Sequence, residues 1–294
     1  MSSNFNTENV ADLARFISSI ERREPEAFQY LEDQFETIDR APVLGVTGPP
    51  GVGKSTLVNR LIKQARDDGL RVAVVAVDPS SPFSGGALLG DRVRMQDHSA
   101  DTGVFIRSMS TKGHLGGLNS SIYDVVMALS MAEFDLVILE TVGVGQGEVE
   151  VARCSDQTAL VLVPAYGDAV QLIKAGIQEI TNCFIINKTD RFEPDQLIND
   201  LRRLVDDPDT LEIFPLSAQT GEGVNTCYES LLEFVREQNS DESHRKEIRS
   251  NHLESLLRER IENQVHEQLQ GIESEVVNPY LETHTILGPD SDNV

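Results

Sequence analysis

The stretch Gly48 to Ser55 reads GPPGVGKS and matches the pattern G-x-x-x-x-G-K-[ST]. In a loop of this pattern, backbone N–H groups surround the α- and β-phosphates of a nucleotide, and the lysine reaches the β- and γ-phosphates. The loop follows the apolar run Pro42–Val46 and precedes a predicted helix over Lys54–Arg66. This strand–loop–helix context predicts that phosphate binds at the N-terminus of that helix. The residues expected to contact the nucleotide here are Gly48, Gly51, Val52, Gly53, Lys54, Ser55 and Thr56.

A second motif, NKTD, ends at Asp190 and follows the apolar run Cys183–Ile186. The Asp190 carboxylate can accept hydrogen bonds from the N1–H and the 2-amino group of guanine, which adenine does not offer. A site built around such a group can reject the wrong base by as much as ~10⁴-fold, because the carboxylate would otherwise remain unpaired. The two motifs together predict a guanine-nucleotide site.

Neighbouring residues are expected to complete the base site. Asn187 should tether adjacent loops, and the stem of Lys188 should cover the base. Ser217 and Ala218 follow the strand-like run Ile213–Leu216 and should close over the base through backbone amides.

Residues 41–237 alternate apolar strand patterns with helical patterns, as parallel α/β proteins do. Further strands are expected at Val72–Val77, Val104–Ile106, Leu136–Leu139 and Ala159–Val163. We therefore predict an α/β domain over residues 41–237, with a mostly parallel central sheet flanked by helices.

Both ends of the chain predict helical extensions. Residues 1–40 contain two amphipathic patterns, Val10–Glu21 and Glu24–Ile38. Within a C-terminal arm at residues 238–294, the polar run NSDESHRKE predicts a linker into a long helix. Apolar residues recur there every four positions and form an apolar stripe, Leu257, Ile261, Val265 and Leu269. The stripe could pack against the α/β domain or form a contact between the two subunits of a dimer.

The formal charge of −23 argues against a nucleic-acid-binding surface, where neutralisation of phosphates dominates affinity. Acidity spread along a chain with few lysines favours a salt-adapted, halophilic cytoplasmic protein as a hypothesis. Ordinary acidic solubility is the alternative.

The composition also bears on location. No apolar run approaches the length of a bilayer span, and the N-terminus lacks the regions of a signal peptide, so we expect a soluble, cytoplasmic protein. The cysteines, Cys154, Cys183 and Cys227, are widely scattered, which favours buried thiols over disulfides or a thiolate metal site.

Acidic residues at predicted strand ends are candidates for magnesium binding and catalysis. Asp78 follows one strand and Glu140 another, at the sheet edge that faces the ligand in open α/β folds. Ser55 should bind Mg²⁺ directly, since this ion keeps several waters and takes few protein ligands. Asp91 is a third candidate carboxylate, and Gly143 can offer its N–H to the γ-phosphate.

Val144 follows Gly143, at the position where small signalling GTPases often have a glutamine that orients the attacking water. An alkyl group cannot hydrogen-bond to water, and Gln146 lies two residues further along the chain. We therefore expect slow hydrolysis by the isolated protein and acceleration when a partner or second subunit completes the site.

Several long motifs carry a resemblance to a known family. They are GPPGVGKST, VDPSSPFSGG, LGDRVRM, LGGL and ETVGVGQGE. Across residues 41–225 the chain resembles the MeaB/ArgK group of P-loop GTPases.

The resemblance implies a GTP-hydrolysing chaperone that gates cofactor loading and protection of an adenosylcobalamin-dependent mutase, typically methylmalonyl-CoA mutase. Family members work as homodimers. By motif match, Asp78, Asp91 and Glu140 correspond to acidic residues around magnesium and catalysis, and Val144–Glu150 corresponds to a switch that touches the mutase.

One segment departs from the family pattern. Where the family has PGGGDELQ, Pro164–Gln171 reads PAYGDAVQ. Tyr166 and Val170 make this segment more apolar, which bears on coupling to the partner rather than on nucleotide binding.

A nickel-insertion GTPase and a regulatory module remain as alternatives, whereas a chromosome-partitioning ATPase does not fit. A nickel-insertion GTPase usually carries clustered histidines or cysteines, whereas the histidines of this chain are dispersed. A chromosome-partitioning ATPase has a lysine where this chain has Pro49, and lacks NKTD. A nucleotide-binding regulatory module with little hydrolysis stays open because of Val144.

Overall fold

The computed structural model describes residues 9–79, 98, 100–111, 121–141, 146–164, 181, 183–204 and 211–270. Its centre is a seven-stranded sheet in the order β3-β2-β4-β1-β5-β6-β7, and every described strand pair is parallel. The strands are β1 Val43–Thr47, β2 Val72–Pro79, β3 Val104–Thr111, β4 Leu136–Thr141, β5 Gln157–Leu162, β6 Cys183–Ile186 and β7 Glu212–Pro215. The predicted α/β fold with a parallel sheet is confirmed.

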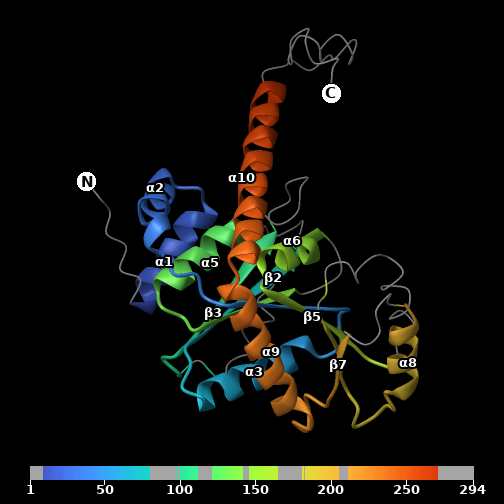
Figure 1. Cartoon of the computed structure of the whole chain (residues 1–294). Helices are drawn as coiled ribbons and strands as arrows, with labels where there is room; N and C mark the ends of the chain where they lie inside the picture. The colour runs from blue at the N-terminus through green and yellow to red at the C-terminus, as the bar shows by residue number, and fades with distance from the viewer. Residues whose placement is uncertain are drawn as a thin grey trace, which may run out of the picture. The chain divides into compact units, whose positions relative to one another are not determined.

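Helices cover both faces of the sheet (Figure 1). The helices among the described residues are α1 Val10–Glu21, α2 Pro25–Gln34, η1 Phe35–Thr37, α3 Lys54–Asp67, α5 Ser121–Met131, α6 Gln146–Cys154, α8 Asp195–Leu204, α9 Val224–Ser240 and α10 Glu242–Gln270. Alternate residues of one strand enter different cores, since side chains point to opposite faces. Ala73 and Val75 pack with α1, α2, α5 and α6, whereas Val72 and Val74 pack with α3 and α9. Helix α8 packs on β5 and β6 through Leu197 and Leu201.

A buried ionic cluster fixes the start of β1. The side chain of Asp156 is fully buried, and its carboxylate accepts hydrogen bonds from Arg40 Nη1 at 2.7 and 2.8 Å and from the Val43 backbone N–H at 2.6 Å. Arg40 also donates to the Cys154 carbonyl at 2.6 Å and to Asn239 Oδ1 at 3.0 Å. The N-terminal segment, α6 and α9 therefore meet at Arg40, whose guanidinium group neutralises the buried Asp156 carboxylate, as a buried charge requires.

The helix predicted at roughly Glu24–Ile38 is present over Pro25–Thr37, and its last turn, η1, is a 3₁₀ helix. One prediction after the α/β domain was wrong. The predicted linker after Gln238 is helical, because α9 runs to Ser240 and α10 begins at Glu242. Asp241 alone separates them, and its carboxylate accepts from the Ser243 N–H at 3.1 Å, which caps the new helix.

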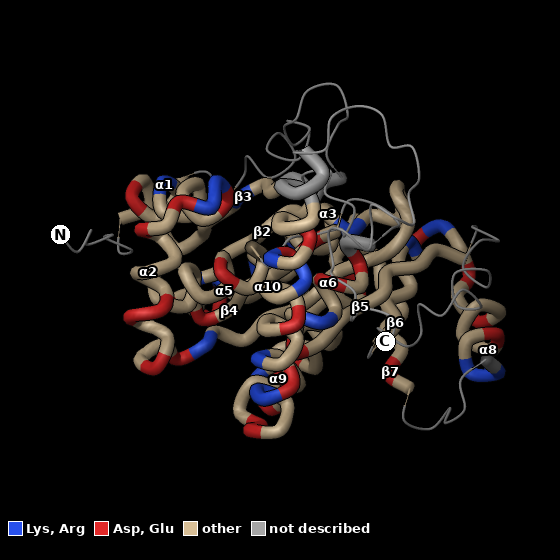
Figure 2. Tube along the Cα trace, turned by 90° about the horizontal axis from the view of Figure 1, so that it is seen from above, with Lys and Arg blue, Asp and Glu red and all other residues tan. Residues whose placement is uncertain are grey.

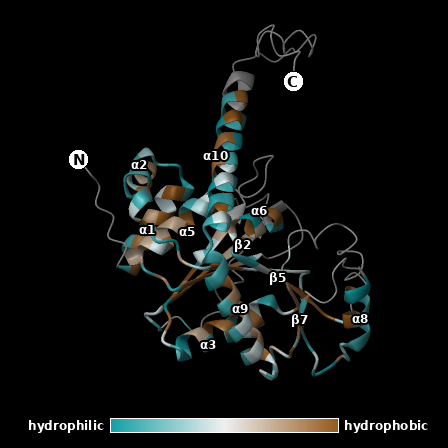
Figure 3. Cartoon of the chain, in the orientation of Figure 1, coloured by the Kyte–Doolittle hydropathy of each residue, from teal (hydrophilic) through white to brown (hydrophobic). Residues whose placement is uncertain are grey.

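The chain divides into two compact units, Met1–His252 and Leu253–Val294. The described part of the second unit is the C-terminal portion of α10, along which hydrophobic residues recur (Figure 3). In the apolar stripe, Leu257, Ile261 and Val265 are 52%, 58% and 39% exposed. The side chain of Leu269 lies outside the described residues. The described stripe residues are therefore uncovered in the single chain.

The surface agrees with the acidic composition, since Asp and Glu recur on covering helices such as α2 and α9 (Figure 2). Cys154, Cys183 and Cys227 are all buried free thiols, as predicted. Burial raises the pKa of Cys154 and Cys227 to about 12. None of the helices within the described ranges is both long and apolar enough to cross a bilayer.

Candidate functional site

The phosphate loop, Gly48–Ser55, connects β1 to α3 at the carboxyl edge of the sheet. Two of its glycines are required by close contacts. Gly48 has φ +141°, and a Cβ there would lie 2.3 Å from the Val161 carbonyl oxygen. Gly53 has φ +100°, and a Cβ would lie 2.5 Å from the side-chain amide of Asn187. These are backbone conformations and approaches that an L side chain does not allow.

Lys54 begins α3 and is 6% exposed. Its ammonium donates to the carbonyl oxygens of Gly48 at 2.5 Å and Pro49 at 3.0 Å, so it bridges the opening of the phosphate loop. A bound phosphate would compete for the same donor. The geometry thus places a buried cation where the sequence motif predicts one.

Ser55 and Glu140 form the oxygen pair expected of a magnesium site. The Ser55 hydroxyl donates to Glu140 Oε1 at 2.7 Å, and Glu140 is 2% exposed. The register of β4 against β1 sets Glu140 level with Val46, just before the phosphate loop. A hydroxyl and a buried carboxylate suit Mg²⁺, which prefers oxygen and uses few protein ligands. The described residues contain no group of three or more His, Cys, Asp or Glu side chains that could hold a metal ion.

Some predicted site residues fall outside the described residues. The backbone of Asp78 lies near the carboxyl end of β2, paired with Ser110 of β3, but its side chain is not described. Asp91, Gly143 and Val144 lie outside the described ranges, as do Tyr166 and Val170.

Asn187 joins the phosphate loop to the loop that follows β7. Its Nδ2 donates to the Val52 carbonyl at 2.8 Å, and its Oδ1 accepts from the N–H of Ala218 at 2.9 Å and of Lys188 at 2.8 Å. Lys188 adopts φ +65°, and its ammonium donates to the Gly51 carbonyl at 2.7 Å. The structure therefore brings the NKTD motif and the phosphate loop into direct contact.

Asp190 is oriented by the base loop, Ser217–Gly221. The Ser217 hydroxyl donates to Asp190 Oδ1 at 2.6 Å, and Arg191 Nε lies 3.5 Å from the second carboxylate oxygen. The hydrogen bond from Ser217 is the main reason that the pKa of Asp190 lies below its ordinary value. The carboxylate is thus an acceptor at neutral pH, as recognition of guanine N1–H and the 2-amino group requires.

The structure adds one residue that the sequence did not predict. Arg60 of α3 donates to the carbonyls of Ala218 at 3.0 Å and Gln219 at 2.7 Å. No motif identifies it, because its acceptors are backbone atoms about 160 residues away in the chain.

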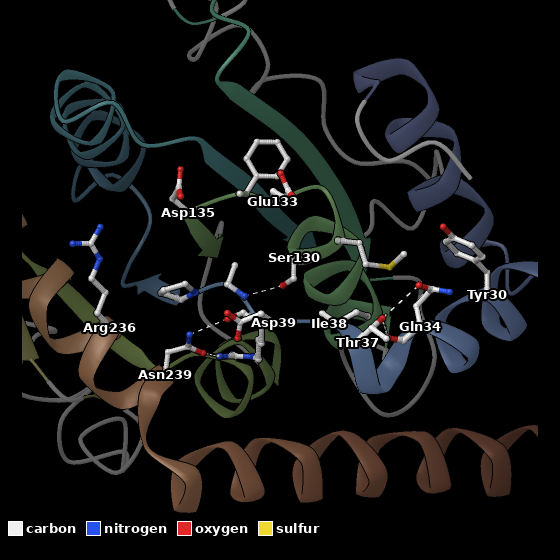
Figure 4. Close-up of a pocket in the computed structure, with 15 residues that line it drawn as sticks. Tyr30, Gln34, Thr37, Ile38, Asp39, Ser130, Glu133, Asp135, Arg236 and Asn239 are labelled. Atoms are coloured by element: carbon white, nitrogen blue, oxygen red, sulfur yellow. Dashed lines mark hydrogen bonds between the residues drawn. The ribbon is translucent and has the colours of Figure 1, made fainter. Parts of the chain in front are cut away.

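A separate hollow of about 700 Å³ lies at the amino edge of the sheet, where β1 and β4 begin (Figure 4). Polar groups in its wall bind one another. The Ala41 N–H donates to Ser130 Oγ at 2.9 Å, and Asn239 Nδ2 donates to the Arg40 carbonyl at 2.9 Å. The N-terminal segment, α5 and α9 therefore meet at this hollow, away from the phosphate loop.

A family model described as Methylmalonyl Co-A mutase-associated GTPase MeaB matches residues 13–272. The chain belongs to the MeaB family. Among relatives of this MeaB-family chain, a protein of Pyrococcus abyssi named as a GTPase is 43% identical over 264 residues, covering 88% of the chain and 80% of the relative. GTPase ArgK of Escherichia coli is 34% identical over 273 residues, covering 84% of the chain and 82% of ArgK.

A solved structure described as an LAO/AO transport system kinase matches with a TM-score of 0.67, covering 96% of the chain and 93% of that structure. At 24% identity it shows the fold alone. The family match and the named relatives establish that this MeaB-family chain is a P-loop GTPase.

Proposed function

We propose that this GTPase gates cofactor loading and protection of an adenosylcobalamin-dependent mutase of the methylmalonyl-CoA type. The observation that carries the proposal is the family match over residues 13–272, whose description names association with methylmalonyl-CoA mutase. The contacts between the phosphate loop and the NKTD motif support a nucleotide-controlled role, because they link the residues expected to bind the phosphates with those expected to bind the base.

Magnesium is proposed as the metal partner of GTP. Ser55 and Glu140 would hold it, with Asp78 and Asp91 as further carboxylates by motif match. The bound ion would neutralise charge on the β- and γ-phosphates. Lys54 would add a second cation at the same phosphates, and Gly143 would offer its N–H to the γ-phosphate.

Slow intrinsic hydrolysis is part of the proposal. Val144 stands after the switch glycine and supplies no hydrogen-bonding group for the attacking water. A partner that completes the site would accelerate the reaction, which would couple hydrolysis to client engagement.

We propose a homodimer built through the C-terminal arm at residues 238–294, with residues 1–40 as an extension of the GTPase domain at 41–237. The exposure of Leu257, Ile261 and Val265 supports the dimer, since a repeated apolar stripe on a helix favours a partner surface. The charge of −23 supports a salt-adapted cytoplasmic protein.

A role in nickel insertion has less support than the mutase proposal. The dispersed histidines and the lack of a metal-holding group among the described residues do not favour it.

The client proposal predicts nucleotide-dependent capture of a purified adenosylcobalamin-dependent methylmalonyl-CoA mutase on the immobilised chain in multimolar KCl. We expect more mutase to be retained with a non-hydrolysable GTP analogue than without nucleotide. We also expect single-turnover GTP hydrolysis to rise at least about tenfold when the mutase is added, since completing a GTPase site in trans can give far more.

The matched control is the Lys54→Ala chain, which should retain the mutase equally with and without the analogue. Equal retention by the unaltered chain in both conditions would contradict the proposal. So would turnover above ~1 s⁻¹ without a partner, because this exceeds unassisted GTPase rates.

A further inference from the structure

Arg60 lies on α3, six residues after Lys54, and is partly buried. Helix α3 packs in the same core as α9, which begins just after the base loop. Figure 1 shows α3 and α9 on the same face of the sheet. The helix that begins with the phosphate-binding lysine therefore also reaches the loop proposed to contact the base.

The contacts of Arg60 use one edge of its guanidinium group. Nε donates to the Ala218 carbonyl at 3.0 Å, and Nη2 donates to the Gln219 carbonyl at 2.7 Å. Two parallel donors across consecutive carbonyls match the planar fork of arginine, and the point charge of a lysine cannot reproduce both bonds.

The base loop is closed on itself by its other hydrogen bonds. The Ser217 N–H donates to the Glu222 carbonyl at 2.9 Å, and the Gly221 N–H donates to the Ser217 carbonyl at 2.8 Å. The Thr220 N–H donates to Ser217 Oγ at 3.2 Å. The loop is thus a compact turn, and Arg60 holds it from outside through carbonyls that these bonds do not use.

The loop residues in turn hold the side chains of the NKTD motif. Ser217 donates to Asp190, and the Ala218 N–H donates to Asn187 Oδ1. Any shift of this turn would move both contacts together. Arg60 is thus connected to Asp190 through a single intervening loop.

We infer that Arg60 is a positioning residue for the guanine base, tying the base loop to the phosphate-binding helix so that Asp190 is held in place when nucleotide binds. The inference rests on the proposed base site around Asp190.

Stopped-flow release of a fluorescent GDP analogue tests the inference. We expect the Arg60→Ala variant to release GDP about tenfold faster, because hydrogen bonds from a charged donor are lost at the loop. Affinity for inorganic pyrophosphate should stay unchanged, since Lys54 and the phosphate loop are intact. In turnover assays, the KM for GTP should rise while kcat stays the same. Arg60→Lys should release GDP at an intermediate rate.

The matched control is Arg66→Ala on the same helix. The Arg66 guanidinium donates to Asp101 at 2.9 and 3.0 Å and to the Leu70 carbonyl at 2.6 Å, and has no contact with the base loop among the bonds described. This variant should release GDP at the wild-type rate, even if its melting temperature falls.

Two results would overturn the inference: release of GDP from Arg60→Ala at the wild-type rate, or equal weakening of GDP and pyrophosphate. If the alanine variant does not fold, Arg60→Lys decides the question, and wild-type release from it would count against the inference. If the proposal of a guanine site around Asp190 were itself wrong, the unaltered protein would instead bind GDP and ADP with equal affinity.

Discussion

The Asp190→Asn variant is expected to bind xanthosine diphosphate more tightly than GDP. Asp190 accepts from Ser217 through Oδ1, and an asparagine can keep that bond through its own Oδ1. Its amide nitrogen then presents a hydrogen-bond donor in place of the second carboxylate oxygen. Xanthine carries an oxygen where guanine has its 2-amino group, so xanthine can accept a hydrogen bond from the new donor. Guanine cannot, because its 2-amino group is itself a donor.

The change of preference should be large. Sites that read a base by buried hydrogen bonds can discriminate by as much as ~10⁴-fold, because the wrong partner leaves polar groups unpaired. Competition of GDP and xanthosine diphosphate for one fluorescent nucleotide measures the ratio. The control is Asp195→Asn, an exposed carboxylate at the start of α8, which should leave the preference for GDP unchanged. An Asp190→Asn variant that still prefers GDP would show that another group reads the base.

The Lys54→Ala variant is expected to lose tight binding of GTP. The ammonium is buried in the mouth of the phosphate loop and is held by the carbonyls of Gly48 and Pro49. Removing one partner of a buried charge contact costs about 2–5 kcal/mol, which corresponds to a rise in the Kd for GTP of roughly 30- to 4,000-fold. Equilibrium titration with a fluorescent GTP analogue in the presence of Mg²⁺ gives this change directly.

Lys63→Ala provides the control for charge and helix effects. Lys63 lies on the same helix in an exposed pair with Asp67, and such pairs contribute little. Its Kd for GTP should match that of the unaltered chain. If Lys54→Ala kept full affinity while remaining folded, the phosphate loop would not be the nucleotide site.

The fold was predictable where the determinants are local. The runs that became β1, β4, β5 and β6 are short and apolar, and each is fully buried in the sheet. The phosphate loop and NKTD could be recognised because glycine, lysine and carboxylate occur at fixed spacings. The observed contact of Asn187 with Val52 follows from those motifs lying at one edge of a parallel sheet.

The errors and omissions arose where composition does not determine structure. The polar run after Gln238 has the composition of a linker, yet a single capping residue, Asp241, lets one helix follow another. The pairing of Arg40 with Asp156 spans 116 residues, and no local pattern relates the two. Arg60 binds backbone carbonyls, which every residue has, so the sequence could not indicate which residues it contacts.

Selection of guanine over adenine is the claim on which the account depends. Isothermal titration of the purified, unaltered protein with GTP and with ATP, in the presence of Mg²⁺, tests it most directly. The account predicts saturable heat with GTP and affinity for ATP weaker by at least about 100-fold, since adenine leaves the Asp190 carboxylate unpaired. Equal heats and equal affinities for the two nucleotides would contradict it.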